Sequence, residues 1–126
     1  MNFKGVAVAI NSMPTEDMEL FDPFASDSGF EWETVDDHYD IHEMVMYRDE
    51  DGSHTRFLRM EPGAGIDERL SHDHYEELFI IEGKIVDKRL DETFSSGMYA
   101  CRTPGMPHGP YETPTGCLTI EFRYYD

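Results

Sequence analysis

Three side chains that commonly bind divalent metals stand at alternate positions near the middle of the chain: His72, His74 and Glu76. In an extended strand successive side chains point to opposite faces, so these three would project to the same side. Imidazole nitrogen and carboxylate oxygen suit a borderline divalent cation, which they bind at about 2.0–2.2 Å. A further histidine, His108, follows a Pro-Gly turn later in the chain. The pattern indicates a metal site, with His108 as a candidate for an additional ligand.

Each part of this pattern also has an ordinary explanation. A His-x-His pair in a strand is usually a surface or hydrogen-bonded pair, and Glu76 and Glu77 could be solvated charges where a strand begins. The other histidines lack comparable spacing, and we expect His38 and His42, which lie in a charged run, to face solvent. The group formed by His72, His74 and Glu76, together with the later turn that carries His108 at a suitable distance, favours a metal site over these alternatives.

From about residue 31 onward the chain consists of short β-like runs separated by turn signals. The runs that alternate apolar with polar residues, or are rich in β-branched and aromatic ones, are 31–35, 41–47, 55–60, 78–81, 84–87, 98–101 and 118–122. We expect Glu82 and Gly83 to form the turn of a hairpin whose second strand is 84–87. No segment shows a long period of 3.6 residues, so little or no helix is expected. Many short strands predict an all-β, antiparallel double-sheet barrel or sandwich.

The N-terminal region differs in character from the rest. Residues 11–30 are rich in proline, aspartate and serine, which predicts an irregular connection. The apolar run Val6–Ile10 predicts a short strand that covers a sheet edge or exchanges with a second copy. We therefore expect an N-terminal strand and irregular arm over 1–30, packed on the barrel or on a dimer partner, and a β-barrel over 31–126. A homodimer is the expected assembly.

The chain is strongly acidic. Its 27 acidic and 10 basic residues give a formal net charge of −17 over 126 residues. Nucleic acid and anionic lipid both attract basic patches, so we expect binding to neither nucleic acid nor membrane. No apolar run is long enough to span a bilayer, and the N-terminus does not resemble a signal peptide, so a cytoplasmic location is expected. In a reducing compartment, Cys101 and Cys117 should be buried free thiols rather than a disulfide.

The two segments that carry these histidines, residues 65–83 and 97–109, resemble the paired motifs of the cupin superfamily. The first cupin motif runs from a glycine through His-x-His to a glutamate, and after six residues to a glycine; Glu76 and Gly83 keep that last spacing. The second motif is a glycine, five residues, Pro-x-Gly, two residues and a histidine. Gly97, Gly105 and His108 match it, although the proline stands one place late.

The chain is also similar, from about Trp32 to Phe122, to the cupin subgroup named for ChrR-type anti-sigma factors. The similarity includes the runs Tyr47–Asp49, Arg59–Gly63 and Glu76–Gly83. In that subgroup two histidines, a glutamate and a distal histidine bind zinc. The resemblance therefore implies a cupin jelly roll with one divalent metal per chain, held by His72, His74, Glu76 and His108.

The spacing within the first motif departs from the family. Cupins usually have three residues between the second histidine and the glutamate, whereas one residue separates His74 from Glu76. Counted back from Glu76 with the family spacing, His72 becomes the second histidine and Leu70 takes the place of the first. Either the loop is two residues shorter here, or His74 is a substitute ligand. His72, Glu76 and His108 are ligands in both alignments, whereas the role of His74 depends on the alternative.

Two kinds of function remain open for such a site. Neutral histidines with a carboxylate favour Fe²⁺ or Zn²⁺, and Mn²⁺ or Ni²⁺ also fit. The first hypothesis is a metal-dependent enzyme, dioxygenase-like or lyase-like, acting on a small oxygen-bearing organic molecule. Tyr99 and Arg102 are candidates for orienting this small-molecule ligand, and no catalytic residue is assigned. The second is a non-catalytic metal- or ligand-binding cupin, such as a zinc-holding sensor or storage module, and a metal-free structural barrel is a third alternative.

Overall fold

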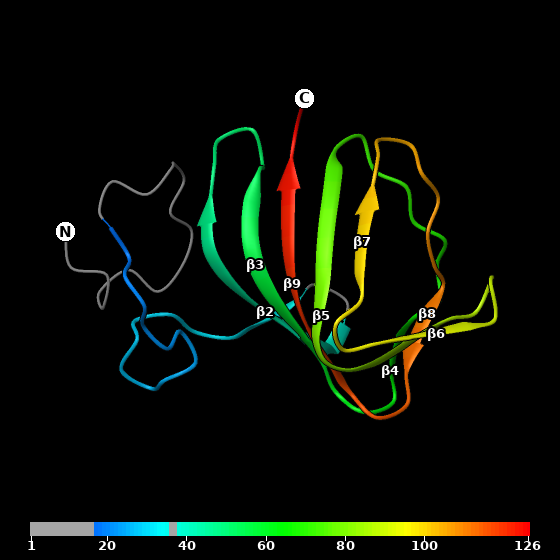
Figure 1. The fold of residues 1–126 in the computed structure, drawn as a ribbon, viewed down its shortest axis with the longest axis horizontal. Helices are drawn as coiled ribbons and strands as arrows, with labels where there is room; N and C mark the ends of the chain where they lie inside the picture. Colours follow the sequence, from blue (N-terminus) through cyan, green and yellow to red (C-terminus); the bar gives the residue numbers. More distant parts are fainter. Residues whose placement is uncertain (1–16, 36–37) are drawn as a thin grey trace.

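The protein is an antiparallel β-structure that curls into a barrel (Figure 1). The computed structural model describes residues 17–35 and 38–126. The strands are, in chain order, β1 Glu33–Val35, β2 His38–Arg48, β3 His54–Met60, β4 Ala64–Ile66, β5 Tyr75–Asp87, β6 Glu92–Ser95, β7 Tyr99–Arg102, β8 Tyr111–Thr113 and β9 Cys117–Tyr124. The described residues contain no helix. The predicted all-β, antiparallel double-sheet barrel is therefore confirmed.

Two sheets share the long strand β5. The first sheet has the order β1-β2-β3-β9-β5-β7, and the second has the order β4-β8-β5-β6. In Figure 1, β2, β3, β9, β5 and β7 stand side by side, while β4, β6 and β8 lie together at the end of β5. The two sheets enclose the interior, and β5 links them.

Gly83 lies within β5, where the sequence predicted the turn of a hairpin; that prediction is wrong. The strand continues from Tyr75 to Asp87 and bends at Gly83, whose φ is 87°. A Cβ atom at this position would lie 2.1 Å from the carbonyl oxygen of Gly116, so only glycine permits this close approach of two backbones. The bend lets the strand leave the first sheet and enter the second.

The inside of the barrel has an apolar half and a charged half. The apolar half is a cluster of buried side chains: Ile41, Met60, Ala64, Leu78, Ile80 and Cys117. The charged half consists of ion-paired side chains on the same strands: Glu43, Arg56, Glu76, Arg102, Glu121 and Arg123. Because side chains alternate along a strand, Glu76, Leu78 and Ile80 of β5 all point inward, and the charged half continues directly into the apolar half.

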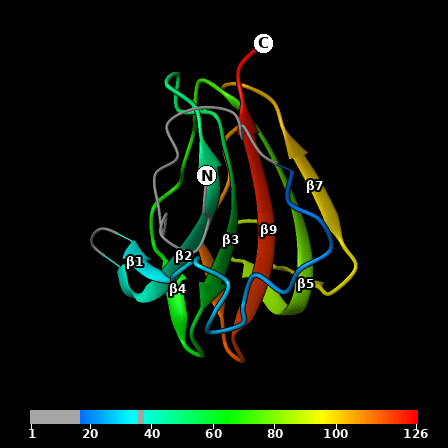
Figure 2. The same ribbon diagram turned by 90° about the vertical axis from the view of Figure 1, so that its left-hand side faces the viewer.

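Residues 17–32 cross the outer face of the first sheet (Figure 2). Phe24 stacks on Trp32 with 5.6 Å between ring centroids, and it meets the Phe57 ring of β3 edge-on at 4.8 Å. The guanidinium of Arg59 lies 4.4 Å from the centroid of the Trp32 ring. These aromatic and cation–π contacts hold the segment against the sheet.

The remaining part of the predicted arm, residues 1–16, lies outside the described residues, and so does the strand predicted over Val6–Ile10. The division of the chain at residue 30 therefore stays a prediction. The described part of the chain has no helix that is long and apolar enough to cross a membrane. Cys101 and Cys117 are free thiols, as predicted, but only Cys117 is buried, whereas Cys101 is exposed.

Candidate metal centre

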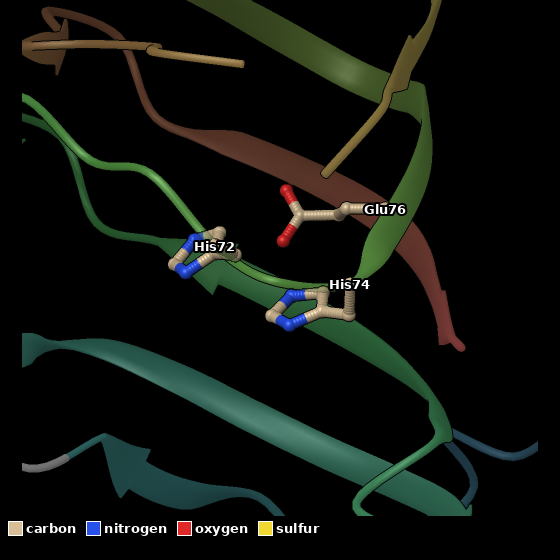
Figure 3. Close-up of side chains that lie close together, drawn as sticks. All are labelled: His72, His74 and Glu76. Atoms are coloured by element: carbon tan, nitrogen blue, oxygen red, sulfur yellow. The ribbon is translucent and has the colours of Figure 1, made fainter. Parts of the chain in front are cut away.

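His72, His74 and Glu76 lie together where the chain enters β5 (Figure 3). Each offers one ligand atom, and the three atoms are within 4.8 Å of one another. The His72 and His74 rings stack with 4.7 Å between centroids, and the Glu76 carboxylate points toward them. His74 and Glu76 are buried, with 5% and 6% of their surface exposed. The structure thus brings together the three side chains that the spacing places on one face.

His108 reaches the same place through backbone pairing with Leu70. The Leu70 N–H donates to the His108 carbonyl at 2.7 Å, and the His108 N–H donates to the Leu70 carbonyl at 2.8 Å. The His108 ring lies 5.0 Å from the His72 ring between centroids. Its Nδ1 is 3.3 Å from the Met106 carbonyl oxygen, which leaves Nε2 as the natural ligand atom.

His74 has a buried nitrogen without a partner. Its Nε2 has no hydrogen-bond partner among the described residues. Burial, and then the charges of Arg123 and His72, lower the pKa of His74 and favour the neutral imidazole. A buried polar atom left unsatisfied costs about 1–3 kcal/mol. A metal ion bound at this nitrogen would remove that cost.

Glu76 stands between two arginines on the neighbouring strands. Arg102 of β7 and Arg123 of β9 are both its cross-strand partners. Arg102 donates to Oε1 at 2.7 Å, whereas the Arg123 guanidinium is 3.8 Å from Oε2. Burial alone would raise the pKa of Glu76, but Arg102, His108 and Arg123 hold it below its usual range. The carboxylate is therefore ionised, and Oε2 retains lone pairs for a metal.

The donor set fits a divalent transition metal. Burial, and then the charge of Arg102, lower the pKa of His108, so this imidazole also favours its neutral, metal-binding form. Neutral imidazoles with one carboxylate suit zinc and iron as well as other first-row metals. His72, His74, Glu76 and His108 are the residues that could hold it.

His72, Glu76 and His108 border a cavity of about 160 Å³ inside the barrel, whereas His74 does not line it. Its wall also includes inward side chains of other strands: Arg56, Arg102, Tyr111, Glu121 and Arg123. Arg102 donates to the Tyr111 hydroxyl at 2.7 Å, and Arg56 donates to Glu121 at 2.9 Å. Burial raises the pKa of Tyr111, so its hydroxyl stays protonated. The wall thus combines fixed cations, carboxylates and a neutral hydroxyl around the histidines.

The two candidates for orienting a ligand, Arg102 and Tyr99, lie on opposite faces of β7. Arg102 points inward to Glu76. Tyr99 is 60% exposed, and its hydroxyl donates to Glu77 on the outer face. Tyr99 borders a second cavity and not the one that His72 and Glu76 line. Arg102 is therefore the better placed of the two.

The remaining histidines lie away from the centre. His42, which follows the inward Ile41 in β2, is 3.5 Å from Glu61 and 20% exposed, so it is less solvent-facing than expected. His54 begins β3 and is buried, which the sequence did not reveal.

Three charged residues of the cavity were not found from the sequence: Arg56, Glu121 and Arg123. All three alternate with apolar residues in β3 or β9, and such charges are usually assigned to the solvent face. In β9 that assignment is reversed, because Glu121 and Arg123 face the cavity. The sequence shows that polar and apolar side chains alternate along this strand, but it does not show which face of the strand turns inward.

The structure is similar to solved cupins. It matches an RmlC-like cupin from Ralstonia eutropha JMP134 with a TM-score of 0.64 at 15% identity, covering 73% of this chain and 61% of that one. It matches an acetylacetone dioxygenase from Acinetobacter johnsonii with a TM-score of 0.63 at 14% identity, covering 86% and 76%. A chain from the Rhodobacter sphaeroides complex of SigE with the anti-sigma ChrR matches with a TM-score of 0.60 at 15% identity, covering 75% and 49%. The fold is therefore that of a cupin.

The family model of the ChrR cupin-like domain matches residues 24–123. The chain belongs to this family, as the motif resemblance implied. A comparison with curated proteins found no match. The chain spans 61% of the length of the Ralstonia cupin and about half of the chain from the SigE–ChrR complex, so the likeness concerns the cupin portion of those proteins.

Proposed function

We propose that this protein is a small cupin metalloenzyme, dioxygenase-like or lyase-like, that acts on a small oxygen-bearing organic molecule. The proposed ligands of its single divalent metal are His72, His74, Glu76 and His108. The observation that carries the proposal is the buried, unpartnered Nε2 of His74, within a group whose ligand atoms lie within 4.8 Å. The structural likeness to acetylacetone dioxygenase supports an enzymatic role.

Fe²⁺ and Zn²⁺ are the favoured metals. When bound, the metal would supply Lewis-acid polarisation or, in the case of Fe²⁺, oxidation–reduction chemistry. Arg102 contributes by holding Glu76 and the Tyr111 hydroxyl at the same time, each at 2.7 Å. This pairing fixes the carboxylate and the phenol relative to the histidines, so the ligand site is organised before a substrate enters.

The position of Leu70 favours His74 as a substitute ligand. Leu70 stands where one family alignment places the first histidine, and its backbone pairs with that of His108 at the cavity. An aliphatic side chain cannot bind a metal. His74, two residues past His72, supplies an imidazole in the same group.

A second candidate function is a metal- or ligand-holding module without catalysis. It is favoured by the state of the two carboxylates in the cavity wall, since Glu76 is paired with Arg102 and Glu121 with Arg56. Arg102 holds the pKa of Glu76 below its usual range, so this carboxylate is a weak base. The family resemblance to the ChrR domain is compatible with such a role.

Metal analysis of histidine variants tests the ligand assignment. We expect one metal per wild-type chain, and a loss of affinity of at least about 100-fold in His74→Ala and in His108→Ala. His42→Ala is the matched control, because this histidine lies on β2 away from the cavity. Unchanged metal content in His108→Ala would overturn the ligand set, and unchanged affinity in His74→Ala would leave the three-ligand alternative.

Turnover separates the two functions. Iron-loaded protein that consumes oxygen with a diketone or phenolic compound supports the dioxygenase. Tightly held zinc without turnover of any compound in the panel supports the holding module instead.

We also propose that two copies pair through the outer face of the first sheet. Phe79, Ile81, Phe122 and Tyr124 are exposed there, and a patch of this kind is commonly an interface. Light scattering with Phe122→Glu tests this, since a dimer that persists in the variant would contradict it. A cytoplasmic location stays a prediction.

A further inference from the structure

We propose that the ligand of this cupin is a small carboxylic acid with an apolar tail. Its carboxylate binds Arg102 and Arg123 beside the metal centre, and its tail occupies a second cavity. The inference rests on the proposed function, because it assumes one divalent metal at the centre. It names the class of substrate for the same site.

The charges around the first cavity balance without a metal. The ionised side chains in its wall are three arginines and two glutamates: Arg56, Arg102, Arg123, Glu76 and Glu121. Arg56 also binds Glu43 of β2, with 2.5 Å between Nη1 and Oε2. Three arginines therefore face three carboxylates, and a divalent metal would add two positive charges. Because uncompensated buried charge is costly, the metal-loaded cavity favours an anionic ligand.

Arg102 and Arg123 have N–H groups to offer such an anion. A guanidinium has five donors, of which Arg102 uses one on Glu76 and one on the Tyr111 hydroxyl. Nη2 of Arg123 lies 3.8 Å from Glu76, which is an ion-pair distance and longer than a hydrogen bond. Both arginines border the cavity. Their remaining donors can bind a carboxylate through charge-assisted hydrogen bonds of about 2.7–2.9 Å.

A second cavity, of about 150 Å³, adjoins the first. The side chains that border both cavities are Leu78, Ile85, Arg102, His108 and Tyr111. Each cavity far exceeds the roughly 10–15 Å³ that one water needs. Because Arg102 borders both cavities, a molecule whose head lies against this arginine has room for its tail in the second cavity.

The second cavity is lined mainly by apolar side chains, including Ile80, Leu90, Phe94, Met98, Met106 and Pro107. Leu90, Met98 and Met106 are exposed although they are large and apolar. Asp87 also borders the cavity, but its Oδ1 accepts the N–H groups of Arg89 and Leu90 at 2.9 and 3.0 Å. Because that carboxylate serves the turn after β5, the cavity offers mainly hydrocarbon, which suits an apolar tail.

Calorimetric titration of the zinc-loaded protein with three probes tests this inference. The probes are 3-phenylpropanoate, 3-phenylpropanol, which lacks the charge, and propanoate, which lacks the ring. We expect the phenyl acid to bind at least tenfold more tightly than either of the others. Equal binding of acid and alcohol would overturn the proposed carboxylate site, and equal binding of the two acids would overturn the proposed tail site.

Two variants test where the carboxylate and the apolar tail of the ligand bind. Arg123→Gln should weaken 3-phenylpropanoate at least tenfold while leaving the alcohol unchanged, and Phe94→Ala should weaken 3-phenylpropanoate but not propanoate. Arg69→Gln is the matched control, because Arg69 is exposed in the loop before His72. Equal losses in Arg69→Gln and Arg123→Gln would contradict the assignment. If a variant does not fold, the comparison of the three probes on the wild-type protein still tests the proposed carboxylate and tail sites.

Failure of this inference can be told apart from failure of the proposed function. Metal analysis before any probe is added reports on the metal centre alone. Protein without a bound metal would overturn the proposed function, and this inference with it. Protein that holds one metal per chain but does not prefer the acid would overturn only the inference.

Discussion

The charged and apolar halves of the barrel interior lie on the same strands but are held together differently. In β5, Glu76 belongs to the charged half, while Leu78 and Ile80 belong to the apolar half. In β3, Arg56 belongs to the charged half and Met60 to the apolar half. The apolar half gains free energy from burial, at about 25 cal/mol per Å² of apolar surface. The charged half must offset the desolvation of its ions through pairing, so it contributes little net stability.

We infer from this contrast that the charged half serves the proposed binding site rather than folding. Its arginines and glutamates lie around the histidine group and line the cavity, to which the buried apolar cluster contributes Met60 and Leu78. A hydrophobic interior along the whole length of the strands would fold at least as well. Substitutions in the two halves should therefore differ in their effects on unfolding and on binding.

The largest effect is expected from removing only one partner of a buried ion pair in the charged half. Arg56 donates to Glu121 at 2.9 Å and to Glu43 at 2.5 Å, and all three side chains are largely buried. Arg56→Met leaves a carboxylate without its cation and should lower the free energy of unfolding by about 3–5 kcal/mol. Urea denaturation of the metal-free protein measures this.

The double variant Arg56→Met, Glu121→Leu is the control for this experiment. It removes both charges, and Glu43 keeps Arg48 at 3.6 Å. We expect it to regain at least half of the stability that the single variant loses. A double variant less stable than the single one would mean that the ion pairs do contribute to folding, and the contrast between the halves would fail.

In the apolar half, Ile41→Ala should cost about 3 kcal/mol, because it leaves a cavity in a well-packed cluster. Metal content per folded chain should stay unchanged. Leu20→Ala is the control, since Leu20 is 96% exposed and should cost less than about 1 kcal/mol. Equal costs for the two substitutions would contradict the placement of the core.

The long strands and the histidine group were predictable because their signals are local. Residues 41–47 and 55–60 alternate clearly, and the structure has strands there. β4, β6 and β8 contain only three or four residues, which is too few to show a period. The spacing predicted that His72, His74 and Glu76 lie together, as they do, although the two histidines stand in the segment before β5 rather than in the strand.

The arginines of the site could not be predicted, because they depend on pairing between distant segments. Glu76 faces Arg123 only through the register of β5 against β9, and it faces Arg102 only through the register of β5 against β7. Period-two alternation identifies two faces of a strand but not the one that turns inward. In Cys117–Tyr124 the charged Glu121 and Arg123 face the cavity, whereas the apolar Phe122 between them is exposed.

A third effect, of about 2 kcal/mol, is expected from His54 as the pH is lowered. His54 is 4% exposed, and burial together with Arg56 and Arg123 lowers its pKa from 6.5 to about 4. Between these values the unfolded chain binds a proton that the folded protein does not, so stability falls as the pH drops from about 6.5 to 4. From pH 7 to pH 5 this loss is about 2 kcal/mol, at about 1.4 kcal/mol per pKa unit.

The variant His54→Asn isolates that contribution. Its Nδ2 can still donate to the Gly52 carbonyl, which His54 Nδ1 contacts at 3.0 Å. The difference in unfolding free energy between the wild type and the variant should change by about 2 kcal/mol between pH 7 and pH 5. A difference that is independent of pH would show that His54 is not held neutral.

The smallest effect is expected from a charged pair outside the barrel. Lys88 lies 3.3 Å from Asp67 and 3.6 Å from Glu112, with 39% of its side chain exposed. Its N–O distances are longer than the 2.5 and 2.9 Å of the Arg56 pairs, and water screens its charges, so Lys88→Gln should change the free energy of unfolding by less than about 0.5 kcal/mol. Lys88 is, like Arg56, a cation between two carboxylates, but the carboxylates of Arg56 are closer and largely buried. A cost for Lys88→Gln as large as that for Arg56→Met would mean that burial does not separate the inner charges from the outer ones.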